Sequence, residues 1–117
     1  MDVSKKMEKI IEADSRYRVE AYSFVMEALA FTLRKLEKTR HVSGQELLEG
    51  IKEYALQQFG PMTRTVFEHW GVRCTEDFGE IVFNMVKAGL MGRTARDSKD
   101  DFKKGYDFRE VFDKAVE

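Results

Sequence analysis

The sequence predicts a mainly α-helical fold of five to six helices with a small C-terminal β-hairpin. Three observations support this: the 117 residues include one proline, apolar residues recur at helical spacing, and helix start and stop signals follow one another in order. We expect one globular domain over 1–117, with N-terminal helices at 1–40. The remainder, 41–117, has the element order of a winged-helix unit.

Two helices are expected before residue 40. At 4–13, Met7, Ile10 and Ile11 share one face, which is typical of a short amphipathic helix. From 18 to 38 two apolar stripes run side by side. A helix that is apolar over so wide an arc is mostly buried, so we expect this helix to be central.

The third expected helix has a clear beginning and end. Ser43 and Glu46 are spaced as a capping box, in which each side chain accepts a hydrogen bond from the other residue's backbone amide. Helical spacing of apolar residues continues to Phe59. The helix should end near Gly60, because Pro61 disfavours the helical conformation in the residue before it.

A short helix is expected at 61–70, since proline is well tolerated in a first helical turn. Met62, Val66 and Trp70 lie four residues apart, with Phe67 beside them, and are predicted to face inward. Gly71 is well placed to end this helix in a left-handed conformation.

The last part of the chain is predicted to combine a helix with a hairpin. Thr75 is expected to cap a helix that Gly89 ends. Residues 90–94 and 105–108 are predicted to pair as two strands, before a closing helix near 109–116.

These spacings predict a single hydrophobic core. The core residues are those that we place on the inward faces of the helices. They are Phe24, Val25, Leu29, Leu48, Ile51, Phe59, Val66, Trp70, Phe78, Ile81, Val82 and Met85.

Composition excludes several classes of protein. The formal net charge of −1 provides no global basic field for nucleic acid or a membrane. No apolar run approaches the roughly 18 residues of a membrane-spanning helix, and we expect no secretory signal. The single cysteine, Cys74, cannot form an intramolecular disulfide, so we expect a cytoplasmic protein.

The residues with catalytic or metal-binding potential are few. His41, His69 and Cys74 are the soft-metal ligands, and none are paired at the spacing of a zinc site. We expect His69 to be structural and His41 to have a hydrogen-bonding loop role. Arg73 and the start of a helix beside Cys74 would lower its thiol pKa, so a Cys74-dependent enzyme is an alternative hypothesis. A small apolar filler is the preferred interpretation of Cys74, and we assign no catalytic, cofactor-binding or metal-binding residue.

The winged-helix order raises the alternative of a nucleic-acid-binding protein, and charge argues against it. Residues 41–89 contain four Lys or Arg against seven Asp or Glu, a net charge of −3. Affinity for a phosphate backbone depends on Lys and Arg, so the sequence disfavours this function.

The helix beginning near Thr75 has a mixed outer face. Phe83, with Met91 beyond the helix end, lies beside an acidic rim of Glu76, Asp77 and Glu80. Such a mixture suits a protein contact. The alternative is that Phe83 packs beneath the N-terminal helices.

Several stretches resemble a known family: RYRVEAYSFVMEAL, HVSGQELLEGIKEYALQQFGPMTRTVFEHWGV, TEDFGEIVFNMVKAGLM and DSKDDFKKGYDF. The family consists of small uncharacterised bacterial proteins catalogued as restricted to the planctomycete and verrucomicrobial lineages. The resemblance covers roughly residues 10–113 and implies one globular unit, with no assigned activity, cofactor or catalytic residue. From the residues themselves we predict a small cytoplasmic protein-interaction module whose partner is another protein or a second copy of the chain.

Overall fold

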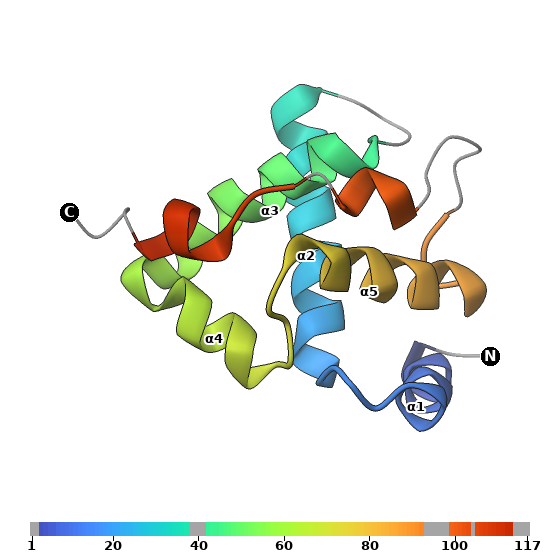
Figure 1. Cartoon of the computed structure of the whole chain (residues 1–117). Helices are drawn as coiled ribbons and strands as arrows, with labels where there is room; N and C mark the ends of the chain where they lie inside the picture. Colours follow the sequence, from blue (N-terminus) through green and yellow to red (C-terminus); the bar gives the residue numbers. More distant parts are fainter. Residues whose placement is uncertain (1–2, 38–41, 93–98, 104, 114–117) are drawn as a thin grey trace.

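The computed structural model describes residues 3–37, 42–92, 99–103 and 105–113. Within these ranges it is mainly helical, as predicted, with five α-helices (Figure 1). They are α1 (Val3–Ala13), α2 (Val19–Leu36), α3 (Gly44–Phe59), α4 (Thr63–His69) and α5 (Thr75–Lys87). Two 3₁₀ turns, η1 (Gly60–Met62) and η2 (Lys99–Phe102), and one π-helical turn, η3 (Arg109–Asp113), connect and extend them.

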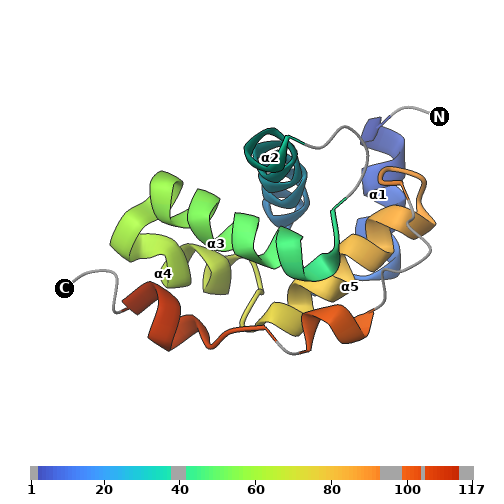
Figure 2. The same ribbon diagram turned by 90° about the horizontal axis from the view of Figure 1, so that it is seen from above.

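The helices are arranged around α2. In Figures 1 and 2, α3 crosses α2, α4 and η3 lie at one end of the molecule, and α1 lies at the other end with the C-terminal half of α5. Ala21, Tyr22, Val25 and Ala28 of α2 are all fully buried. The prediction of a mostly buried central helix is therefore confirmed for the first half of α2 only, since its last turn is exposed, with Leu36 40% exposed.

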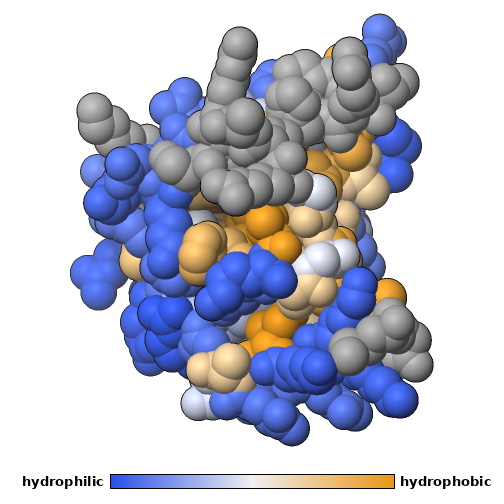
Figure 3. Space-filling view, turned by 90° about the vertical axis from the view of Figure 1, so that its right-hand side faces the viewer, coloured by the Kyte–Doolittle hydropathy of each residue, from blue (hydrophilic) through white to orange (hydrophobic). Residues whose placement is uncertain are grey.

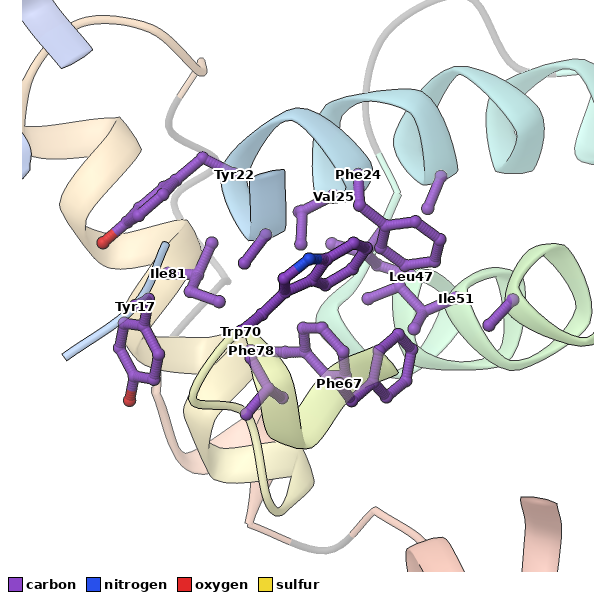
Figure 4. Packing of buried hydrophobic residues seen from close by; sticks show 14 of the residues in the cluster. Tyr17, Tyr22, Phe24, Val25, Leu47, Ile51, Phe67, Trp70, Phe78 and Ile81 are labelled. Atoms are coloured by element: carbon purple, nitrogen blue, oxygen red, sulfur yellow. The ribbon is translucent and has the colours of Figure 1, made fainter. Parts of the chain in front are cut away.

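Aromatic rings form much of the core between α2, α3 and α4 (Figure 4). The ring of Phe67 lies 5.5 Å from that of Phe24, 5.2 Å from that of Phe78 and 5.4 Å from that of Phe112, measured between centroids. Trp70, which is 9% exposed, packs against Phe24 and Phe67. Tilted and edge-on ring pairs at these distances each add to the stability gained from burial.

The helix boundaries agree with the local signals in the sequence. Ser43 and Glu46 form the predicted capping box, with N–H···O distances of 3.1 and 2.9 Å. Gly71 ends α4 with φ of +90°, and a Cβ atom there would lie 2.2 Å from the carbonyl oxygen of Arg16. Gly89, with φ of +77°, follows α5. Gly71 is therefore required both by its conformation and by the close approach of another backbone segment.

The inward face of α4 differs from the prediction. Met62 is 54% exposed and Val66 is half-buried, whereas Phe67 is fully buried. The reason is that residues 60–62 form a 3₁₀ turn, which has three residues per turn, and the α-helix begins only at Thr63. Four-residue spacing from Met62 therefore does not follow one helical face.

The predicted C-terminal hairpin is wrong: none of the residues that the structure describes is in a β-strand. Residues 93 and 94 of the expected first strand lie outside the described ranges, as do 114–116 of the expected closing helix. The tail instead buries Phe102, Phe108 and Phe112 against the helices. Without a hairpin, the winged-helix interpretation of 41–117 has no structural basis.

The predicted core is confirmed in most positions. Leu29, Phe59, Val66 and Val82 are half-buried at its edge, and the other predicted residues are buried. The prediction omitted other buried residues, among them Tyr17, Tyr22, Leu47, Phe67, Val72 and the aromatic residues of the tail.

Candidate interaction surface on α5

The first turn of α5 is held by residues of the tail and of the α1–α2 connection. Cys74, not Thr75, is the N-cap, and its side chain makes no capping hydrogen bond. Thr75 is the first residue of the helix, its side chain is buried, and its hydroxyl donates a hydrogen bond to the Phe102 carbonyl oxygen at 2.6 Å. The expectation that Thr75 caps this helix is therefore wrong, because its hydroxyl holds η2 instead.

Asp77 is also committed to structure. Its carboxylate accepts hydrogen bonds from the Tyr17 hydroxyl at 2.6 Å and from the Arg73 backbone N–H at 2.8 Å. Burial, together with donation to this carboxylate, raises the pKa of Tyr17. Asp77 thus joins the α1–α2 connection to α5 and does not contribute to an open acidic rim.

Glu80 links two segments across the outer side of α5. Its Oε2 lies 3.3 Å from Arg16 Nη2 and 3.2 Å from Lys99 Nζ. Arg16 also binds Asp14 at 2.7 Å, and its hydrogen bonding holds the pKa of the Asp14 carboxyl well below the usual range. The Asn84 amide donates to the same carboxylate at 3.0 Å.

Phe83 projects from this helix as a large exposed apolar side chain. It is 41% exposed, so it does not pack beneath the N-terminal helices. Lys99 Nζ lies 4.2 Å and Lys87 Nζ 5.2 Å from the ring centroid. Both distances are within the range of cation–π attraction, so two ammonium groups flank an accessible aromatic ring.

A separate pocket of about 260 Å³ lies at the N-terminal end of α5. Cys74 lines it together with Arg73, Lys103 and Tyr106. Burial raises the pKa of the Cys74 thiol, and the carboxylates of Asp77 and Glu76 raise it further. The expected net lowering of this pKa is therefore wrong, because burial and the two carboxylates outweigh the lowering by the Asp77 backbone N–H at the helix start.

The structure does not assemble the histidines and the cysteine into one site. His69 is exposed at the end of α4 and does not line the Cys74 pocket, and His41 lies outside the described residues. Among the residues with described positions, no group of three or more His, Cys, Asp or Glu could hold a metal ion. None of the described helices is both long enough and apolar enough to span a bilayer.

Comparison with models of known protein families, with curated proteins and with solved structures gave no match. The resemblance to a lineage-restricted bacterial family stays a prediction.

The sequence left open whether Phe83 faces outward, and it did not indicate Lys99 as a neighbour of Phe83. The two residues are sixteen positions apart, and Lys99 lies between the two predicted strands, at 90–94 and 105–108. Gly79 could have indicated this neighbour, because a glycine within a helix often marks a close contact. The Phe102 ring packs against Gly79, where a Cβ atom would lie 3.0 Å from it. This contact brings η2, and with it Lys99, onto α5.

Proposed function

We propose that this chain is a small protein-interaction module, and that the C-terminal half of α5, centred on Phe83, is its contact surface. The observation that carries this proposal is an aromatic residue, Phe83, that is 41% exposed and whose ring is flanked by two ammonium groups. Exposed aromatic side chains with polar neighbours are enriched where proteins bind one another.

Lys99, which lies over the ring, also forms an ion pair with Glu80. This ion pair favours one position of the ammonium group in the free protein, so less side-chain freedom has to be lost on binding. A preformed aromatic contact of this kind is better suited to recognition than a freely rotating one. The partner is a different protein in this proposal, and a second copy of the chain is the alternative.

The location proposed for this interaction is the cytoplasm. The support is the single cysteine, which is exposed and unpaired, as is common in a reducing compartment. The exposed carboxylate of Glu76 in the first turn of α5 supports a protein partner over a nucleic-acid partner, because it would repel phosphates.

The test is capture from a lysate of the source organism with the full chain as bait, in two matched variants. Phe83→Ser removes the proposed contact. Met62→Ser removes another exposed apolar side chain, on η1, which contacts α4 and η3 at the other end of the molecule. We expect the same protein to be captured by the wild type and by Met62→Ser, and to be lost with Phe83→Ser. Thermal melting should show that both variants stay folded.

Two outcomes would contradict the proposal. One is capture that is unaffected by Phe83→Ser. The other is a nucleic acid as the retained species, bound tightly at low salt and released as salt rises.

A further inference from the structure

The apolar surface at Phe83 continues along α5 towards its C-terminal end. Val86 follows Phe83 by three positions, so the two share one side of α5, and Val86 is half-buried. Leu90, also half-buried, lies just beyond the helix, after Gly89 with its φ of +77°. Met91, also half-buried, extends this surface beyond the helix. Figure 3 shows apolar surface exposed between hydrophilic side chains on the same end of the molecule.

Two lysines lie beside this apolar stripe, whereas Glu80, three positions before Phe83, already pairs its carboxylate with Arg16 and Lys99. Residues 81–92 include Lys87 and no Asp or Glu. None of the described carboxylates forms an ion pair with Lys87, whose ammonium group instead lies near the Phe83 ring. Lys6 adds a second ammonium group at the end of α5, where its Nζ lies 3.4 Å from the Gly89 carbonyl oxygen.

We propose that the partner presents a short segment in which Asp or Glu residues stand beside apolar side chains, and that Lys87 binds one of these carboxylates. This inference rests on the proposed function and specifies its partner chemistry. Apolar side chains of the segment would cover Phe83, Val86 and Leu90, in the manner of an amphipathic helix on a complementary surface.

A continuous polyanion fits this surface less well than a short acidic segment. Glu76 and Glu80 lie on the same helix, and Asp100 is exposed next to Lys99. A phosphate backbone or an anionic bilayer would meet these carboxylates together with the lysines. A peptide can place one or two carboxylates at Lys87 and avoid the acidic half of α5.

The probe for the test is a displayed library of random peptides, selected on the full chain. We expect the enriched sequences to combine Asp or Glu with aromatic or aliphatic residues. The best of them, made synthetically, should bind Lys87→Glu roughly tenfold more weakly than wild type at low salt, and the difference should shrink as salt is added. Arg109→Glu makes the same change in net charge on η3, at the other end of the molecule, and should bind as the wild type does.

The outcomes separate this inference from the function on which it rests. Enrichment of basic or neutral peptides, or equal affinity for Lys87→Glu and the wild type, overturns the acidic-partner inference. If such peptides still lose binding with Phe83→Ser, the interaction surface itself survives. Selection of peptides that bind independently of Phe83 overturns both.

Discussion

Replacing Gly50 by alanine should destabilise the protein, although the same change stabilises many helices. Gly50 is a buried residue of α3, and a Cβ atom there would lie 1.7 Å from Thr32 Oγ1 on α2. Thr32 is 3% exposed, and its hydroxyl donates to the Ala28 carbonyl oxygen at 2.7 Å. Rotating the threonine does not remove the conflict, because its Cβ atom would still lie 2.9 Å from the new methyl group.

The magnitude follows from two opposing effects. Alanine gains about 0.5–1 kcal/mol over glycine within a helix. Forcing a methyl group into a packed contact costs about 1–3 kcal/mol, and disturbing the buried hydroxyl's hydrogen bond adds about 1 kcal/mol. We therefore expect a net loss of about 2 kcal/mol and a fall in melting temperature of roughly 8 °C.

Urea unfolding followed by fluorescence of the only tryptophan, Trp70, measures this change. Gly92→Ala is the matched control, because a Cβ atom there meets nothing within 4 Å, and it should be close to neutral. Thr32→Ala removes the most severe overlap, so the double variant should recover at least about 1 kcal/mol relative to additive behaviour. Wild-type stability of Gly50→Ala, or additive effects in the double variant, would refute the packing argument.

Three other predictions concern the buried Trp70, the Cys74 thiol and two tyrosines with a raised pKa. Trp70→Ala should lower the free energy of unfolding by about 3–5 kcal/mol in circular-dichroism melting, because its ring packs against Phe24 and Phe67, whereas wild-type melting would mean that this packing is unimportant. Alkylation of Cys74 by iodoacetamide near neutral pH should be slower than that of an unstructured cysteine peptide, because burial raises the thiol pKa; faster alkylation would revive the enzyme hypothesis. Burial raises the pKa of Tyr17 and of Tyr106 above that of a tyrosine in the unfolded chain. The free energy of unfolding should therefore be constant below about pH 10 and fall above it, because the tyrosines of the unfolded chain ionise first. In a titration to high pH, the tyrosinate absorbance of these residues should therefore rise together with the loss of helical circular dichroism. Tyrosinate absorbance from Tyr17 and Tyr106 that rises while the helical signal is still intact would contradict this prediction.

The parts of the fold that depend on neighbouring residues were predictable from the sequence. The capping box of Ser43 and Glu46 and the left-handed Gly71 each follow from chemistry within a few residues. The tail was not predictable in this way. The alternation of Tyr106 and Phe108 suggests a strand, but the structure has no partner strand for it among the described residues, and Phe108 packs on Phe67 instead.

Glycine explains why the tail packs as it does. A Cβ atom at Gly44 would lie 3.1 Å from the Phe102 ring, and one at Gly79 would lie 3.0 Å from it. Gly44 on α3 and Gly79 on α5 have no side chain, and this makes room for Phe102, more than twenty positions away from either glycine. Helical periodicity identifies which face is apolar, but it does not identify the distant residue that a glycine admits.

The two halves of α5 have different roles, and one residue joins them. The N-terminal half is committed to the fold through Thr75 and Asp77, while the C-terminal half exposes Phe83. Glu80 lies between them and binds both Arg16 and Lys99. Because Lys99 is also the cation closest to the Phe83 ring, the ion pairs that fasten the α1–α2 connection to α5 also set the position of a charge at the proposed contact surface. The surface therefore depends on tertiary contacts. An isolated peptide of the α5 sequence would contain Phe83 and Lys87 but would lack Lys99.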